Sequence, residues 1–378
     1  MTTSIQQQPT TTTAAAAAAP KRRIPYFDLI KGVAIFMVVM GHALTMCIRG
    51  IDSAFVFKLI AQVHMPLFFF VSGYFTFKAT KAGGWATPNL KKRFLQLMVP
   101  FFTMSALWTL YFPHSGLQSP LATNLHDLYQ SYWKSGYWFT LCLFELMLIY
   151  WPLSRVLSRL RRVWQQVAVM LAAYGVLIAL SVTLADEDAN VDWAGFGLLA
   201  QFFPVFMIGA MAHRLREGFE RLRSKQWCVT ASVVGFGVLW YALVYPWDMP
   251  WGECTVAVTA IKFAAMPLMH FALVVVALAL IEPWSARQYA PGVRPNAVTR
   301  FFHLLGNESL GIYLCHYFFL FPLTALQEPM RQLALQAMPL TVVAAAVALA
   351  VTAATLLAIA VIKRSRLLAF LLIGQSLK

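Results

Sequence analysis

Charged side chains are scarce in this sequence. Only 12% of its 378 residues are Asp, Glu, Lys or Arg, whereas 60% are hydrophobic. A soluble domain of this length carries roughly 25% charged residues. Water therefore cannot be the solvent for most of the surface, which excludes a soluble globular enzyme.

Cysteines and acidic residues are also few. The five cysteines lack the spacing of a metal site, so we interpret them as small apolar residues and expect no metal. Their positions also allow a disulfide between Cys47 and Cys254 on the outer face. The net charge is +15. In a soluble protein this excess would suggest nucleic acid, but the basic residues here lie in short loops between apolar runs. We therefore expect no nucleic-acid partner.

Long apolar runs repeat along the whole chain. Each is about 20 residues long, the length with which a helix crosses a hydrocarbon core of ~30 Å. They predict an all-α fold, a polytopic transmembrane helix bundle of about ten spans. The expected spans are 24–46, 55–77, 95–112, 137–154, 164–184, 193–213, 227–246, 256–281, 302–327 and 337–362.

Lys and Arg residues alternate with these spans. A cytoplasmic N-terminus places most of the 30 basic residues in inner segments, as the positive-inside rule requires. Both termini are then cytoplasmic, and we expect a multi-pass protein of the cell (inner or plasma) membrane in contact with membrane lipids. The expected division is a disordered cytoplasmic tail over 1–23, a transmembrane domain over 24–362 and a cytoplasmic C-terminal tail over 363–378.

Three ionisable residues lie within the first predicted span, where each is costly and suggests a function. Lys31 and His42 are 11 residues apart, so they share a helix face about 16 Å apart along the axis. Asp28 can pair with Lys31 at i, i+3. The span thus has one polar stripe, with an ion pair near the inner side and an imidazole nearer the outer side. The alternative is an interfacial ion pair and a packed core histidine.

Later spans carry further polar residues. His64, at a depth similar to that of His42, is a candidate second catalytic group or a hydrogen-bond partner. Lys92 and Arg93, at the inner end of the third span, are either a phosphate anchor or ordinary positive-inside charge. Glu145 needs a partner at its depth, and Lys262 is a candidate.

Several blocks of this sequence occur in a distinctive order. The first runs from Asp28 through Lys31 to His42, and the others cover 64–74, 93–100, 137–139 and 305–316. Together they resemble acyltransferase family 3, a family of membrane-bound acyltransferases, over residues 26 to about 362. That family's first helix carries a basic residue and a histidine separated by ten residues. Lys31 stands where many members have Arg, which keeps the charge but loses the planar fork.

The resemblance implies that an acyl group, often acetyl, moves from cytoplasmic acyl-CoA (acetyl-CoA above all) to a hydroxyl of a glycan, a lipid-linked sugar or another extracytoplasmic acceptor. It implies no metal. In the mechanism that we expect, the donor's phosphates lie near Lys31, Lys92 and Arg93, and Asp28 orients Lys31. His42 acts as general base on the acceptor hydroxyl or carries the acyl group itself.

We expect the acceptor nearer the outer face, in loops 113–136 and 246–255, with aromatic rings against sugar faces and polar groups on hydroxyls. The candidate acceptor-binding residues are Tyr137, Trp138, Glu145, Asp248, Glu253 and His316. The first two are also typical of packing or of the aromatic belt.

Two other classes share these features. A multi-span transporter or flippase, for a small molecule or a lipid-linked sugar, also has buried charges, Pro and Gly breaks and histidines. The sequence shows no clear pair of matching broken helices in its two halves. A non-catalytic membrane scaffold or sensor would keep the fold without the chemistry.

Overall fold

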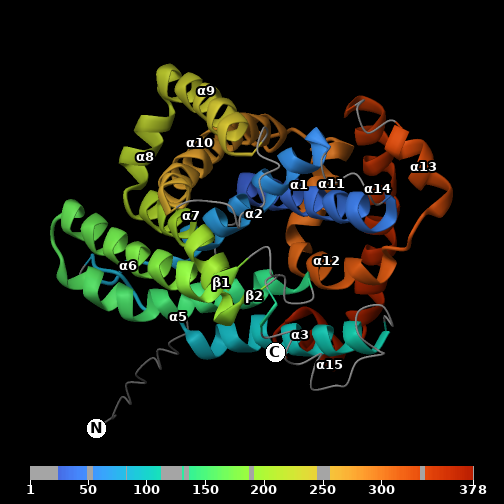
Figure 1. The fold of residues 1–378 in the computed structure, drawn as a ribbon, viewed down its shortest axis with the longest axis horizontal. Helices are drawn as coiled ribbons and strands as arrows, with labels where there is room; N and C mark the ends of the chain where they lie inside the picture. Colours follow the sequence, from blue (N-terminus) through green and yellow to red (C-terminus); the bar gives the residue numbers. More distant parts are fainter. Residues whose placement is uncertain are drawn as a thin grey trace, which may run out of the picture.

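The computed structural model describes residues 24–48, 54–81, 83–111, 130–131, 136–186, 191–244, 256–332 and 337–377. These residues form a helix bundle with one two-stranded hairpin (Figure 1). The predicted all-α bundle is thereby confirmed. The predicted tail 1–23, most of the loop 113–136 and all of the loop 246–255 lie outside the described residues, and with them Asp248, Glu253 and Cys254.

Eight helices of the described chain are long and apolar enough to cross a membrane, or up to nine if one bent pair counts as a span. They coincide with eight of the ten predicted spans. These helices are α1 (Pro25–His42) with the π-helix η1 (Ala43–Ile48), α2 (Phe55–Thr76), α5 (Trp138–Arg159), α6 (Val163–Leu184), the 3-10 turn η4 (Trp193–Gly195) with α7 (Phe196–Arg214), α9 (Gln226–Leu243), α10 (Val256–Gln288) and α14 (Ala337–Ile362).

The predicted span 95–112 is helix α3 (Leu90–Tyr111), which has three basic residues in its first turn and is not among the eight. The predicted span 302–327 is wrong as one helix. It is divided into α11 (Ala297–Asn307), α12 (Ser309–Cys315), η6 (His316–Phe319) and α13 (Thr324–Gln332), with a 100° bend between α12–η6 and α13. Pro322 lies at the bend, where it lacks an N–H donor and cannot continue a helix.

Central and peripheral helices differ in burial. The apolar windows of α1 and α7 are 61% and 67% buried, whereas those of α6 and α9 are each 17% buried. A helix that is apolar all round and mostly uncovered by protein suits contact with lipid. In Figure 1, α1 and α2 lie in the middle of the bundle, with α6 and α9 at its edge.

Two helix crossings bring backbones into direct contact through glycine. A Cβ at Gly32 of α1 would lie 1.9 Å from the carbonyl oxygen of Phe302 in α11, and one at Gly306 would lie 1.8 Å from that of Asp28. Gly209 of α7 meets the Phe70 carbonyl oxygen of α2 in the same way, at 2.1 Å. Small residues at such crossings allow the close approach that holds membrane helices together.

A bulky residue at the α2–α7 crossing should destabilise the bundle. Gly209→Leu forces two backbones apart, so we expect a loss of about 3 kcal/mol, the upper end for overpacking. The measurement is thermal unfolding of the purified protein in detergent. Gly175→Leu in α6 is the matched control, because nothing lies within 4 Å of a Cβ at Gly175. Equal melting temperatures for the two variants would contradict the packing argument.

The remaining short elements lie between and after the long helices. Strands β1 (Ala185–Asp186) and β2 (Val191–Asp192) pair antiparallel between α6 and α7. The buried carboxylate of Asp192 accepts the backbone N–H groups of Gly197 and Leu198, so it caps α7. Helix α15 (Arg366–Ile373) follows α14 and lies beside α3 (Figure 1).

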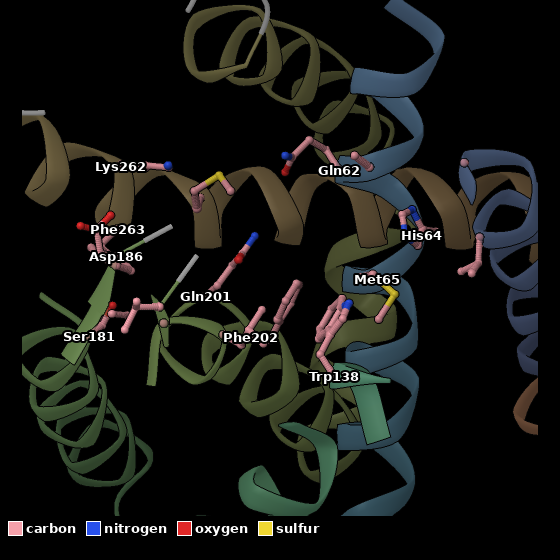
Figure 2. A pocket seen from close by; sticks show the side chains of 18 of the residues that line it. Gln62, His64, Met65, Trp138, Ser181, Asp186, Gln201, Phe202, Lys262 and Phe263 are labelled. Carbon is pink, nitrogen blue, oxygen red and sulfur yellow. The ribbon is translucent and has the colours of Figure 1, made fainter. Parts of the chain in front are cut away.

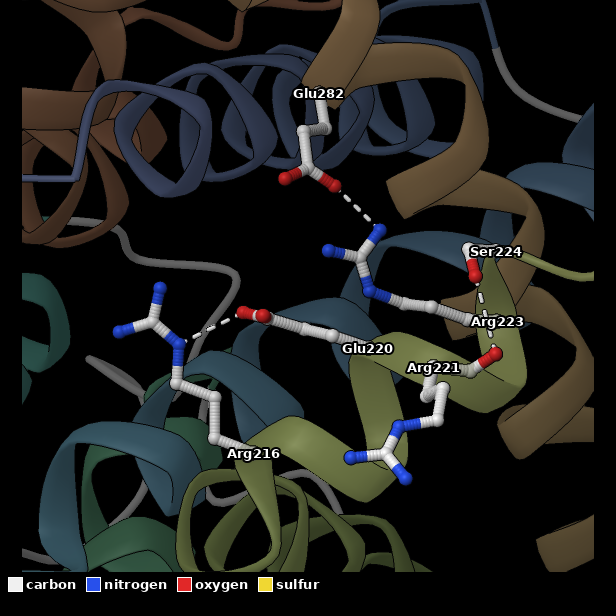
Figure 3. Close-up of polar contacts among 6 residues, drawn as sticks. All are labelled: Arg216, Glu220, Arg221, Arg223, Ser224 and Glu282. Atoms are coloured by element: carbon white, nitrogen blue, oxygen red, sulfur yellow. Dashed lines mark hydrogen bonds and ion pairs between the residues drawn. The ribbon is translucent and has the colours of Figure 1, made fainter.

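The basic connection α8 (Arg216–Arg223) is tied to its neighbours by ion pairs. Arg216 Nε lies 2.7 Å from Glu220 Oε1, and Arg223 pairs with Glu282 of α10 (Figure 3). The hydrogen bond to Glu220 raises the pKa of Arg216. This cluster lies on the side that the basic loops assign to the cytoplasm, and it joins the α7–α9 connection to α10.

Candidate functional site

A cavity of about 1120 Å³ opens among α1, α2, α6, α7, α10 and the β1–β2 hairpin. His42 and His64 line one part of it. Figure 2 shows His64 at one end, Lys262 and Asp186 at the other, and Gln201, Phe202 and Trp138 between them. The hairpin belongs to a segment that the basic loops place outside, so we call this space the outer cavity.

A second cavity, of about 200 Å³, lies between α1, α2, α3, α5 and α12. Its charged lining residues are Lys31 and Arg93, and Ser72, Gln96 and Ser309 add uncharged polar groups. The Nη1 of Arg93 donates to Gln96 Oε1 at 3.1 Å. Because Arg93 lies at the predicted inner end of α3, we call this space the inner cavity.

One face of α1 serves both cavities. Lys31, Ile35 and Val38 line the inner cavity, and Val38 and His42 line the outer one. Their spacings of four, three and four residues follow one face of an α-helix, so the prediction that Lys31 and His42 share a face is confirmed. Val38, Met65 and Tyr313 line both cavities. The two spaces are therefore separated by one layer of side chains.

His42 stands at the end of α1, where the helix changes to the π-helix η1. Its Nε2 lies 2.9 Å from the hydroxyl oxygen of Tyr317, and the ring centroid of His316 is 5.2 Å away. His316 is buried and donates from Nδ1 to the carbonyl oxygens of Ile312 and Tyr313 at 3.0 and 2.8 Å. The break after α12 thus brings a histidine–tyrosine pair against His42.

His64 makes a local bond on its own helix. Its Nδ1 lies 2.5 Å from the carbonyl oxygen of Ile60, and a carbonyl can only accept, so Nδ1 carries the proton. Nε2 is then the bare nitrogen of the neutral ring. His64 lines the outer cavity together with His42, which keeps it a candidate second group for chemistry there.

The predicted ion pair at the inner end of the stripe is confirmed. Lys31 Nζ lies 2.7 Å from Asp28 Oδ1, while Asp28 Oδ2 lies 3.8 Å from His303 Nε2 of α11. Burial, and then the charge of Asp28, raises the pKa of Tyr289 just beyond α10. The contact between His303 and Asp28 was not predicted, since nothing in the spacing indicates that α11 crosses α1 at Asp28. Lys92 is exposed and lines neither cavity.

The predicted acceptor-binding residues lie in different parts of the structure. Trp138 lines the outer cavity, whereas Tyr137 is fully buried and donates its hydroxyl proton to the Leu314 carbonyl oxygen at 3.1 Å. The Glu145 carboxylate lies against Gly195, where its Oε2 would be 2.8 Å from a Cβ. Lys262 lies in the outer-cavity wall.

Among the described residues, the outer cavity is walled mainly by membrane helices. The loops expected to hold the acceptor lie almost entirely outside the described residues, so their role stays a prediction. Gln62, Ser181, Asp186 and Gln201 line the outer cavity, and sequence analysis missed all four as site residues. The available signal was weak. Gln62 and Gln201 are uncharged amides in apolar spans, and Asp186 lies just beyond the predicted span 164–184.

Comparisons with known proteins give one family and two relatives. Residues 24–359 match a family model described as an acyltransferase domain. Nodulation protein NolL of Mesorhizobium japonicum is 34% identical over 116 residues, which are 28% of this chain and 31% of that protein. NolL of Sinorhizobium fredii is 32% identical over 116 residues with the same shares. The chain thus matches about a third of the length of these curated relatives. No solved structure matches.

Proposed function

This chain belongs to acyltransferase family 3, and from that premise we propose that it transfers an acyl group from cytoplasmic acyl-CoA to a hydroxyl of a sugar on the outer side of the cell membrane. Acetyl is the acyl group that we propose. The family match confirms the resemblance seen in the sequence and the multi-pass membrane character.

The observation that carries the proposal is the pair of cavities that meet along α1. The inner one presents two cations, Lys31 and Arg93, which suit the phosphates of a CoA donor. The outer one presents His42, an imidazole suited to proton transfer near neutral pH. Val38, Met65 and Tyr313 line both cavities, so a narrow acyl-bearing arm would have a short path from one cavity to the other.

The chemical step follows from this arrangement. His42 takes the proton of the acceptor hydroxyl while the hydroxyl oxygen attacks the thioester carbonyl carbon. A C–O bond to the acceptor forms and the C–S bond of the donor breaks. The proton then passes from the imidazolium to the CoA thiolate, so the products are the acylated acceptor and free CoA. In the variant with a covalent step, a His42 nitrogen attacks the thioester carbonyl carbon, and CoA leaves as its thiolate. The acceptor hydroxyl then attacks the acyl group, the C–N bond to His42 breaks, and the hydroxyl proton passes to the CoA thiolate.

The outer cavity suits an acceptor larger than one sugar ring. Its volume of about 1120 Å³ exceeds the ~300–1,000 Å³ of typical small-molecule sites. Trp138 and Phe202 add aromatic rings to its wall, and Gln62 and Gln201 offer amide donors and acceptors for hydroxyls. We therefore propose an oligosaccharide or a lipid-linked sugar as the acceptor class.

The test is a direct assay with the full-length protein in lipid nanodiscs. Acetyl-CoA labelled in the acetyl group is supplied with short oligosaccharides or lipid-linked sugars, and mass spectrometry detects the acceptor with one added acetyl group. We expect CoA to be released only when an acceptor is present. Flux of sugar into vesicles in the absence of any acyl donor, with no acetylated product, would contradict the acyltransferase proposal. That result would instead favour a transporter.

Gln201→Leu should weaken acceptor binding alone. Loss of one neutral hydrogen bond is worth about 0.5–1.5 kcal/mol, so we expect the KM for the sugar to rise about 2- to 12-fold while the KM for acetyl-CoA stays the same. Gln226→Leu, at the exposed start of α9, is the matched control. A change in the donor KM for Gln201→Leu would show that the outer cavity does not belong to the acceptor.

A further inference from the structure

The hydroxyl of Tyr317 connects His42 to the chain's backbone. Tyr317 Oη lies 2.9 Å from His42 Nε2 and 3.1 Å from the carbonyl oxygen of Gly136. The same carbonyl oxygen lies 2.9 Å from the hydroxyl of Tyr313, which in turn accepts the backbone N–H of Phe139 at 3.1 Å. Four short contacts thus form one connected network beside the outer cavity.

The number of available protons fixes the direction of these hydrogen bonds. A tyrosine hydroxyl has one proton, and a carbonyl oxygen can accept two hydrogen bonds but donate none. The Gly136 oxygen therefore receives the protons of Tyr313 and Tyr317. With its own proton used, Tyr317 Oη can only accept from His42, so Nε2 carries the proton of the neutral imidazole.

The opposite arrangement, in which Tyr317 donates to His42, leaves one short contact without a proton. If Tyr317 donated to Nε2, its oxygen and that of Gly136 would face each other at 3.1 Å with no proton between them. Only the first arrangement places a proton in every short contact.

We propose that Tyr317 is a positioning residue that holds His42 as the Nε2–H tautomer, so that Nδ1 is the nitrogen that takes the acceptor's proton. This inference deepens the proposed function and rests on it for the catalytic role. When Nδ1 takes the proton, the ring becomes an imidazolium. Its Nε2–H bond to Tyr317 is then charge-assisted and stronger, so the hydroxyl stabilises the charged state of the ring.

The local structure is built to hold this hydroxyl in place. Tyr317 is 3% exposed, and its ring lies 4.2 Å from that of His316 and 5.2 Å from that of Trp108. Gly136 has a φ of +87°, and a Cβ there would lie 2.7 Å from Cζ of Tyr317. Only glycine therefore allows the carbonyl of residue 136 to approach the Tyr317 hydroxyl in this way.

The tautomer of His42 can be measured without an assay of acyl transfer. Protein labelled with histidine carrying ¹⁵N at Nδ1 alone is reconstituted in lipid for solid-state NMR, and the His42 signal is assigned by its loss in His42→Asn. We expect the chemical shift of a bare nitrogen at neutral pH. In Tyr317→Phe the ring stays but the acceptor for Nε2–H is lost, so we expect a protonated Nδ1 population to appear.

Kinetics supply the second readout. Tyr317→Phe should lower kcat about 10- to 100-fold, the range for a hydrogen bond to a charged group, and leave both KM values within about twofold. Tyr150→Phe is the matched control, because Tyr150 is a fully buried tyrosine of α5 that lines neither cavity. It should keep the wild-type kcat and tautomer signal. Thermal unfolding of both variants shows whether they fold.

Two results would overturn the inference. One is a protonated Nδ1 on His42 in the wild-type protein, and the other is an unchanged kcat in a folded Tyr317→Phe. A different result separates the inference from the proposed function. If the wild-type protein shows the expected tautomer but transfers no acyl group to any acceptor, the Tyr317–His42 assignment stands and the acyltransferase proposal fails.

Discussion

His42→Asn is expected to reduce acyl transfer by about 10²- to 10⁴-fold, the contribution of a positioned general base. An amide fits the space of the imidazole but cannot take a proton near neutral pH. If His42 instead carries the acyl group, the loss is at least as large, because an amide is not a nucleophile. The measurement is the initial rate of acetyl transfer by the purified variant, normalised to folded protein.

The matched control for that variant is His213→Asn. The Nδ1 of His213 donates to the Tyr74 carbonyl oxygen at 2.6 Å, and an asparagine amide can still donate there. His213 lines neither cavity, so its variant should keep the wild-type rate. A folded His42→Asn protein that still transfers acyl groups at the wild-type rate would remove His42 from the mechanism.

Arg93→Ala is expected to raise the KM for acetyl-CoA about 10- to 100-fold. The reason is the loss of hydrogen bonds between a guanidinium and a phosphate, worth about 1.5–3 kcal/mol in the inner cavity. The KM for the acceptor should not change, because Arg93 does not line the outer cavity. Donor titration at a saturating acceptor concentration measures the effect.

Lys91→Ala is the control for this prediction, because Lys91 is exposed at the start of the same helix and lines neither cavity. It carries the same positive-inside charge, so it separates phosphate binding from topology. If Lys91→Ala raises the donor KM as much as Arg93→Ala does, the inner basic residues act as a diffuse surface charge. The inner cavity would then not be the binding site for the phosphates of the donor.

The fold could be predicted well where the signal is local. Eight predicted spans coincide with helices that are long and apolar enough to cross a membrane, because hydropathy is summed over neighbouring residues. The span 302–327 was predicted wrongly for the same reason. Its mean apolar character hides the breaks near Glu308 and Pro322, and a window average does not respond to one proline.

The candidate site was predictable only along α1. Asp28, Lys31 and His42 share a face because of the helical period. The structure places Lys31 on the inner cavity and His42 on the outer one, with Asp28 paired to Lys31. Their partners were not predictable. Tyr317 is 275 residues from His42 in the sequence, and it reaches the imidazole only because the chain breaks after α12. No spacing rule connects residues on two different helices.

The sequence by itself determined that this chain is a bundle of membrane helices and which face of the first helix carries Lys31 and His42. Each of these depends on composition within one segment or on the 3.6-residue period. Only the tertiary structure decided that α11 crosses α1 at Gly32 and Gly306, and that two cavities meet at Val38, Met65 and Tyr313. The physical reason is that apolar helices present similar surfaces to one another. Close packing of particular side chains, and not hydropathy, selects which pairs make contact.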